Sequence, residues 1–249
     1  PFHVDPLPDL LVFHGRSLPD GALTASQLTE AWIAAARKQW AADAPALRQA
    51  LLHAVALVPP QPEAGASPPS RVVVLAADDA ALGPALTRAA FDVRPVRFTP
   101  FDADAAAKIE HFETYNRTPA SQRVADIAQA LLESPRSILV ADGNAALAGA
   151  LALAVVPAAR AVLDVGAFDT SSDAAYMERL YIPGLRRAGG LQTALAMAEG
   201  PVLIHNAGAR FDVRGPTIEP RRLDASEIVR RLRDERPSTR PVDSRPPKH

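Results

Sequence analysis

The turn formed by Asp142, Gly143 and Asn144 is where this sequence comes closest to a reactive site. A run of Ile, Leu and Val precedes the turn, and a segment rich in alanine and leucine follows it. β-Favouring residues followed by strong helix formers predict a strand, a sharp turn and a helix. The Gly-x-Ser-x-Gly nucleophile elbow occupies such a turn, and Ala141, Gly143 and Ala145 take the places of its three named residues. The small residues are kept, but the attacking hydroxyl is absent, and we call residues 142–144 the degenerate elbow.

The other two members of a serine triad are also missing from their expected places. A triad needs an acid after a later strand and a histidine after the last one, because the histidine must reach the nucleophile while the acid orients it. The acid position falls near His205 and Asn206, and the next carboxylate is Asp212. The segment after the last expected strand, residues 223–226, contains no histidine. The sequence therefore predicts that the usual triad does not operate here.

A displaced serine site is an alternative that the sequence leaves open. Ser171 and Ser172 follow Asp169, and we expect His205 at the same edge of the sheet. These residue types are those of a nucleophile, a base and an acid. Serines at such positions also commonly cap helices, and we expect a helix to start near Ala174. We expect capping rather than catalysis.

Binding of a ligand or cofactor at the degenerate elbow is a further possibility. Asp142 and Asn144 stand before a helix N-terminus, whose backbone N–H groups can hold a small polar ligand or an anion. The simpler role of both side chains is hydrogen bonding within the turn, and we expect that role. Gly143 and Gly149 lack the third glycine and the compact spacing of a dinucleotide loop. The sequence therefore predicts no cofactor.

Two groups of residues include possible metal ligands, and neither has the spacing of a known site. His111 and Glu113 form half of a zinc site, but no companion pair follows. Asp164, Asp169 and Asp173 supply oxygen ligands for a hard cation, but their spacing matches no calcium loop. We therefore expect no metal and predict that these aspartates form ion pairs. The expected partners are Arg160, Arg179 or Arg186.

Composition indicates a globular domain with appendages and excludes several functions. The 249 residues are 48% apolar and carry a formal net charge of −1, so we expect no basic surface for nucleic acid. No apolar run approaches the roughly 18 residues of a membrane-spanning helix. The absence of cysteine excludes disulfides, thiolate metal sites and cysteine catalysis, but it does not choose a cellular compartment.

Strands and helices alternate along most of the chain, which predicts an α/β fold. Such alternation favours a doubly wound, mainly parallel sheet covered by helices on both faces, here preceded by a small helical segment. The expected strands are residues 71–76, 93–98, 138–140, 161–165, 201–205 and 217–221, and the expected helices are residues 25–42, 45–55, 80–90, 119–132, 191–198 and 225–234.

The first expected helix has a clear start and an apolar face. Thr24 and Gln27 have the spacing of a capping box, and Leu28 and Trp32 follow at helical spacing. Trp32 and Trp40 are its bulky residues, and we expect them to pack on a neighbouring domain, since such rings mainly supply buried area.

Composition divides the chain into four parts. Residues 1–58 form an N-terminal arm and the helical segment, and residues 59–70 form a Pro-rich linker. Residues 71–235 hold the alternating strands and helices of the sheet domain. Residues 236–249 are rich in Pro, Arg and Ser and are predicted to be a flexible tail.

Three stretches resemble a known family of hydrolase-like proteins. They are residues 111–127 (HFETYNRTPASQRVADI), 163–198 (LDVGAFDTSSDAAYMERLYIPGLRRAGGLQTALAMA) and 202–208 (VLIHNAG). Together with the degenerate elbow they resemble the second, C-terminal hydrolase-like unit of large bacterial acetylxylan-esterase-like proteins, over roughly residues 111–210. The resemblance implies a sheet of α/β-hydrolase type, in which glycine at the nucleophile position is usual, in agreement with Gly143.

The resemblance also implies a function. In that family an upstream α/β-hydrolase domain carries the catalysis. This chain would then be a degenerate accessory or structural unit beside a catalytic domain or associated chain, in a secreted or periplasmic protein that acts on polysaccharide. A start at Pro1 without a leader fits a piece of a longer protein. Two alternatives stay open: an active carbohydrate esterase (a deacetylase) using the displaced residues, and a small-ligand-binding module with a cleft near Asp142 and His205.

Overall fold

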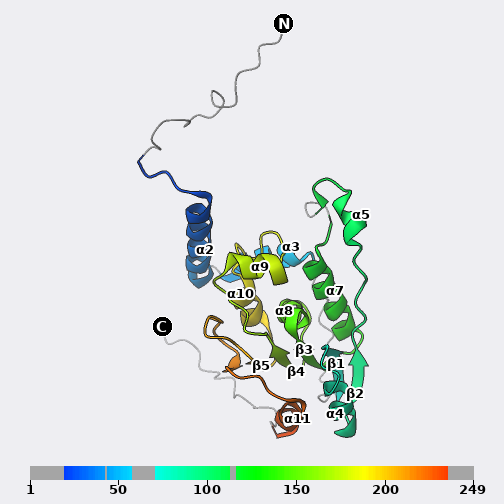
Figure 1. Cartoon of the computed structure of the whole chain (residues 1–249). Helices are drawn as coiled ribbons and strands as arrows, with labels where there is room; N and C mark the ends of the chain where they lie inside the picture. Colours follow the sequence, from blue (N-terminus) through cyan, green and yellow to red (C-terminus); the bar gives the residue numbers. More distant parts are fainter. Residues whose placement is uncertain (1–19, 43, 58–70, 113–115, 235–249) are drawn as a thin grey trace, which may run out of the picture.

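The structure is a computed structural model that describes residues 20–42, 44–57, 71–112 and 116–234 (Figure 1). The N-terminal arm, the Pro-rich linker and the tail lie outside these residues, as do Glu113 and the side chain of Trp40. The helices are α2 (Ala25–Ala42), α3 (Ala44–Val55), α4 (Leu82–Arg88), α5 (Ala103–Ala107), α7 (Pro119–Leu132), α8 (Gly143–Ala152), α9 (Asp173–Arg179), α10 (Gly190–Met197) and α11 (Ala225–Asp234). The strands are β1 (Val72–Ala76), β2 (Asp92–Pro95), β3 (Ile138–Asp142), β4 (Arg160–Asp164), β5 (Val202–His205) and β6 (Thr217–Glu219).

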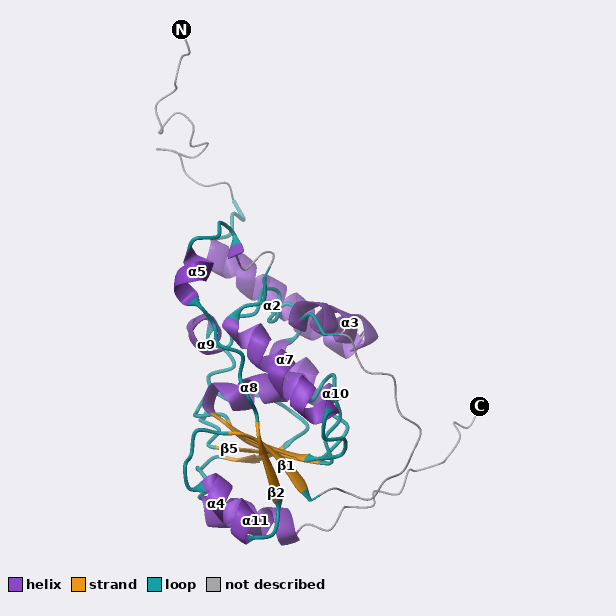
Figure 2. Ribbon diagram, turned by 90° about the vertical axis from the view of Figure 1, so that its right-hand side faces the viewer, coloured by secondary structure: helices purple, strands orange, loops and turns teal. Residues whose placement is uncertain are grey.

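The strands form one sheet in the order β2-β1-β3-β4-β5-β6, and every neighbouring pair is parallel. Strand β3 lies inside the sheet, with Leu139 opposite Val74 of β1 and Ala161 of β4. The strand order reverses between β1 and β3, as in doubly wound folds. Helices α7, α8 and α10 cover one face, and α4 and α11 cover the other (Figure 2). The predicted α/β fold is confirmed, including the strand, turn and helix at the degenerate elbow.

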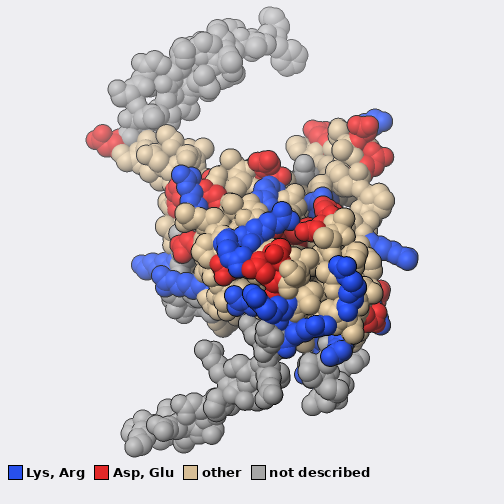
Figure 3. Space-filling view, turned by 60° about the horizontal axis from the view of Figure 1, so that its bottom comes forward, with Lys and Arg blue, Asp and Glu red and all other residues tan. Residues whose placement is uncertain are grey.

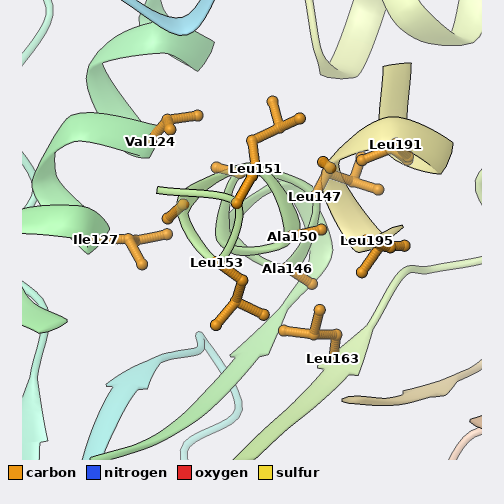
Figure 4. Packing of buried hydrophobic residues seen from close by; sticks show 14 of the residues in the cluster. Val124, Ile127, Ala146, Leu147, Ala150, Leu151, Leu153, Leu163, Leu191 and Leu195 are labelled. Carbon is orange, nitrogen blue, oxygen red and sulfur yellow. The ribbon is translucent and has the colours of Figure 1, made fainter. Parts of the chain in front are cut away.

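Helix α8 is buried on every side. Residues 146–152 are all buried, because the helix consists almost entirely of Ala, Leu and Gly and has no polar face to turn to solvent. Figure 4 shows α8 between Val124 and Ile127 of α7 and Leu191 and Leu195 of α10. Ten residues are too few for a membrane span, and in the described part of the chain no helix is long and apolar enough to cross a bilayer.

The opposite face of the sheet has a smaller core of its own. Leu82 and Leu86 of α4 pack with Ile228 and Leu232 of α11 against Val140 and its neighbours on the strands. Helix α11 is strongly amphipathic, since its apolar residues recur four positions apart and arginines fill the positions between them. The two helices therefore bury their apolar faces against each other and against the sheet.

The helical segment before the sheet is joined to the main core. Leu51 and Val55 of α3 are fully buried in the same cluster as α7, α8 and α10. Helix α2 packs on α3 through Ile33 and Ala36 and not through Trp32, which is 49% exposed. Trp32 is therefore not enclosed in the contact between α2 and α3, and its packing on a neighbouring domain stays a prediction.

Local capping signals account for several element boundaries. The capping box predicted at the start of α2 is present: Gln27 N donates to Thr24 Oγ1 (3.2 Å) and Thr24 N donates to Gln27 Oε1 (2.9 Å). Helix α5 interrupts a stretch in which we expected no regular structure. It forms because the Asp102 side chain accepts the Ala105 N–H (2.9 Å) and caps the helix.

The enclosure of α8 predicts a large difference between two leucine truncations. Leu151 is 0% exposed, whereas Leu132 at the end of α7 is 41% exposed. We expect Leu151→Ala to lower the free energy of unfolding by about 2–5 kcal/mol, because the truncation removes buried contacts and leaves a cavity. The control Leu132→Ala should change it by no more than about 0.5 kcal/mol. Urea denaturation measures both, and equal effects would contradict the enclosed position of α8.

Candidate functional site

The degenerate elbow has the backbone geometry of a strand-to-helix turn that presents a residue to solvent. Strand β3 ends at Asp142, and Gly143 begins α8 with a φ of +55°. A Cβ added to Gly143 would meet no atom within 4 Å, so the space in front of the turn is open. Glycine adopts this left-handed conformation without steric cost, whereas other residues are strained there. The turn is therefore a sharp strand-to-helix turn whose left-handed residue carries no reactive side chain.

The carboxylate of Asp142 is used to hold a neighbouring loop. It accepts the Asp78 N–H (3.0 Å to Oδ1 and 3.1 Å to Oδ2) and the Asp79 N–H (3.2 Å). These residues follow β1, so the loop lies at the point where the strand order reverses. Doubly wound folds usually bind ligands at that point. We expected Asp142 to bond within its own turn; instead it ties the β1 loop to the end of β3.

Arg179 of α9 occupies the space between the turns after β3 and β4. Its Nε donates to Asn144 Oδ1 (2.9 Å), Nη1 donates to Gly166 O (3.0 Å) and Nη2 donates to Val165 O (3.2 Å). The guanidinium carbon also lies 5.5 Å from the centre of the Phe168 ring, within the range of a cation–π contact. Asn144 is therefore engaged by Arg179, and α9 is fixed next to the degenerate elbow.

Asp164 is a buried carboxylate at the end of β4, and its side chain is only 8% exposed. Its Oδ1 accepts the Gly166 N–H (2.9 Å) and the Asn206 side-chain amide (2.7 Å). Its Oδ2 lies 3.1 Å from Nε of Arg222, whose Nη2 lies 3.5 Å from the carboxylate of Asp79. Buried charges need such pairing and hydrogen bonding, because they lose the solvation that water provides. We name Asp79, Asp164, Asn206 and Arg222 the edge network.

Three aspartates that we considered as metal ligands form ion pairs, as predicted, but mostly with other partners. Asp173 pairs with the expected Arg186. Asp164 pairs with Arg222, and Asp169 pairs with Arg210 at 3.2 Å. Two of the expected arginines serve main-chain carbonyls instead. Arg160 caps the end of α11 by donating to Arg231 O and Leu232 O, and Arg179 binds the turns described above.

His205 is buried at the end of β5, where it is 2% exposed. Its Nδ1 accepts the main-chain N–H of Leu223 (3.1 Å), so the ring is neutral and carries its proton on Nε2. Burial lowers the pKa of His205, and the attraction of the nearby Asp164 carboxylate only partly offsets this effect. His205 therefore holds the chain that enters α11, and its Nδ1 is not free to act as a base.

The displaced serine site is not assembled from the residues that we considered. The Ser171 hydroxyl donates to Asp169 Oδ1 (2.6 Å), and this hydrogen bond, together with that from the Ser171 N–H, lowers the pKa of Asp169. Ser171 is exposed, whereas His205 is buried and bonded to Leu223. The Ser172 hydroxyl accepts the N–H of the third residue of α9 (3.2 Å), which confirms the capping interpretation. Ser171 thus meets a weakly basic carboxylate and not a histidine base.

The segment of residues 220–224 leads from β6 to α11 across the carboxyl ends of the inner strands, and we call it the crossing segment. Arg221 O accepts the Asn206 N–H (2.9 Å) after β5, Arg222 reaches the ends of β4 and β1, and Leu223 bonds to His205. Arg222 is therefore paired within the sheet domain, although its side chain is 60% exposed. The crossing segment thus lies over the carboxyl ends of β4 and β5.

The start of α11 is fixed by a second capping box, which the sequence contains as Asp-x-x-Glu. Glu227 N donates to Asp224 Oδ1 (2.8 Å), and Asp224 N donates to Glu227 Oε2 (3.0 Å). Hydrogen bonds from Arg221 and the Asp224 N–H lower the pKa of Glu227 to about 2. The end of the crossing segment is therefore held independently of the edge network.

A cleft of about 570 Å³ lies beside the degenerate elbow. It runs between α4 and the start of α11, on the face where Lys and Arg side chains are mixed with Asp and Glu (Figure 3). Its walls include Ala81, Ala85 and Arg88 of the α4 side and Leu223 of the crossing segment. The walls also include Asp79, which is bonded to Asp142, but Asp142 and His205 themselves do not line the cleft. The cleft is therefore one residue removed from the two side chains near which we expected it.

Metal and cofactor sites find no support in these residues. Among the described residues, no group of three or more His, Asp or Glu side chains is placed to hold a metal ion. Nε2 of His111 lies 3.5 Å from Oε1 of Glu110, and both side chains are largely exposed. Its predicted companion Glu113 lies outside the described residues.

Comparison with models of known protein families and with curated proteins finds no match for this chain. The chemistry of the site therefore has to be judged from its geometry. Its carboxylates accept hydrogen bonds from main-chain and side-chain groups or pair with arginine, and its buried histidine accepts a main-chain N–H. The residue at the elbow is glycine, which has only a hydrogen atom as its side chain. This arrangement stabilises the edge of the sheet and offers no nucleophile with an adjacent histidine base.

The left-handed turn predicts opposite effects for two glycine substitutions. Gly143→Ala should lower the free energy of unfolding by about 1–2 kcal/mol, because a Cβ strains this conformation although the space around it is open. The control Gly83→Ala lies in α4, where the added Cβ makes only an ordinary 3.5 Å contact with Leu75. It should be neutral or stabilising by about 0.5–1 kcal/mol. Thermal or urea unfolding of both variants tests this, and a neutral Gly143→Ala would refute the strained turn.

The buried His205 predicts a pH dependence of stability. Its pKa in the folded state lies below the ordinary 6.5, so unfolding binds a proton as the pH falls below that value. The stabilising contribution of His205 is therefore present above pH 6.5 and decreases as the pH falls towards the folded-state pKa. His205→Asn retains an acceptor for the Leu223 N–H but does not titrate. Urea denaturation at several pH values between 7.5 and 5 should show a smaller loss of stability for His205→Asn than for the wild type, and parallel losses would contradict this role.

Proposed function

We propose that this chain is a degenerate, non-catalytic α/β-hydrolase-like unit that acts as an accessory or structural part beside a catalytic hydrolase domain. The observation that carries this proposal is Gly143, which holds the left-handed conformation of a nucleophile elbow with no hydroxyl to acylate. A scaffold that keeps this turn and loses the attacking group has a use other than hydrolysis at this position. The six parallel strands around the turn agree with a sheet of hydrolase type.

The remaining polar groups at the edge of the sheet support a structural role. Asp164 is paired with Arg222, and Nδ1 of His205 is used by Leu223. The crossing segment covers the ends of β4 and β5, so a substrate could reach these groups only if several hydrogen bonds and an ion pair broke. Removing the partner of the buried Asp164 carboxylate is unfavourable, although Arg222 itself is 60% exposed. The edge is therefore suited to rigidity and not to turnover.

The identity of the partner rests on the resemblance of residues 111–210 to the second unit of acetylxylan-esterase-like proteins. The catalytic domain would then be a carbohydrate esterase, covalently upstream or tightly associated, and its substrate would be an acetylated polysaccharide. Secretion or export to the periplasm follows from the same resemblance. The proposed hydrolase-like unit comprises residues 71–235, and α3 extends its core.

Binding of a small ligand is a second candidate function, and the cleft between α4 and α11 favours it. Its volume of about 570 Å³ falls within the range of small-molecule sites. Catalysis by displaced residues has no comparable support, because Ser171 bonds to Asp169 and not to His205. We therefore rank structural support first, ligand binding second and deacetylation last.

The proposal predicts that the chain does not react as a serine hydrolase. A fluorophosphonate probe should leave it unlabelled, and hydrolysis of aryl acetates should stay at the rate without protein, because Gly143 cannot be acylated and Ser171 has no histidine base. A catalytically active serine esterase, assayed in parallel, serves as the positive control. Stoichiometric labelling that is lost in Ser171→Ala or Ser172→Ala would overturn the proposal and restore the displaced site.

A further inference from the structure

Helix α2 leaves an apolar stripe in solvent. Leu23 before the helix is 56% exposed, and Leu28 and Trp32 on the helix are 39% and 49% exposed. The buried residues of α2 are Ile33, which follows Trp32 directly, and Ala36, which lies one turn beyond Trp32, so the packed part of the helix is its middle and second half. Figure 1 shows the first half of α2 standing clear of α9 and α10. We call Leu23, Leu28 and Trp32 the α2 stripe.

Leu28 and Trp32 are neighbours on the surface of α2, because residues four apart lie on the same side of a helix, and Leu23 stands in the chain just before the helix begins. The guanidinium of Arg187 lies 5.3 Å from the centre of the Trp32 ring and covers part of it. Arg187 is itself exposed, so the stripe ends in a positive charge. Burying such side chains would contribute a favourable free energy of roughly 25 cal/mol for each Å² of apolar surface removed from water. A segment that combines apolar residues with a carboxylate would complement the stripe.

We propose that residues 10–13 (LLVF) of this chain's own N-terminal segment cover the α2 stripe. Leu10, Leu11, Val12 and Phe13 are the longest apolar run between residues 1 and 19, which are otherwise rich in Pro and Asp and lie outside the described residues. Asp9 precedes the run and supplies the carboxylate that suits Arg187. The segment thus has the composition that the stripe calls for.

The connection between the two is short enough to bring them together. Residues 1–19 join the described chain at Asp20, directly before the stripe begins at Leu23. The seven residues from Phe13 to Asp20 can extend about 23 Å. Even if residues 20–25 are fully extended, Trp32 lies no more than about 27 Å from Asp20, within the roughly 33 Å that the ten residues from Leu10 to Asp20 can span. The run can therefore fold back along the stripe, and the covalent tether gives it an effective concentration of the order of millimolar.

Trp32 reports directly on this contact. The chain has two tryptophans, so Trp40→Phe makes Trp32 the sole indole. In that background, acrylamide quenching of the full chain is compared with Leu11→Asp/Phe13→Asp, which disrupts the apolar run. Ser17→Asp, which adds charge to the same segment outside the run, is the control. We expect the disrupted variant to raise the Stern–Volmer constant of Trp32 at least about twofold, because the indole loses its apolar cover, and we expect the control to leave it unchanged.

A second measurement covers the case in which Trp40→Phe alters the fold. The variant Trp32→Phe contains only Trp40, so its fluorescence reports Trp40. Subtracting this fluorescence from that of the native chain gives the contribution of Trp32 without any change at Trp40. Equal quenching in the intact and disrupted chains would overturn the proposal. Quenching that falls as protein concentration rises a hundredfold would also overturn it, because the cover would then come from a second copy.

Discussion

An α-helix without a polar face has to be enclosed, and the architecture of this protein follows from that constraint on α8. The helix needs the sheet beneath it and a helix on each side, which α7 and α10 provide. Those flanking helices are themselves covered in part by α3, which carries buried leucine and valine into the same core. Gly149 shows how close the packing is, since a Cβ there would approach Leu139 of β3 to 3.0 Å. The same helix starts at the degenerate elbow, so the core holds this turn rigidly in place.

Much of the fold could be predicted from the sequence, because it depends on local patterns. Short β-branched runs became the inner strands, and the segment rich in alanine and leucine after residue 143 predicted a helix after a sharp turn. Capping residues such as Thr24 and Ser172 act on their own helices and were also recognisable. The side of α2 that meets α3 was recognisable only in part, because the buried Ala36 lies on the side marked by Leu28 and Trp32, whereas the buried Ile33 lies beside that side and is selected by the neighbouring helix.

The candidate site was less predictable, because its contacts join residues that are far apart in the chain. Nothing around Arg222 indicates that its guanidinium will meet Asp79, which lies 143 positions earlier, or the end of β4. The same holds for His205, whose partner is a main-chain N–H without any sequence signature. The missing nucleophile, by contrast, was recognisable, because an elbow is a local pattern. Sequence reasoning therefore located the turn and did not reveal how its surroundings are closed.

The crossing segment also has a consequence for how the protein is made. Helix α11 covers the same face of the sheet as α4, yet it is the last helix of the described chain, and domains tend to fold as units during synthesis. Until the ribosome has added α11, Val73, Val140 and Leu203 have only α4 to cover them from that side. A nascent chain with strands β1 to β5 complete therefore presents apolar sheet surface, and contacts of such long sequence separation form slowly. We therefore expect a chaperone to bind the nascent chain on the sheet face that α11 will cover, and not on the face that carries α8.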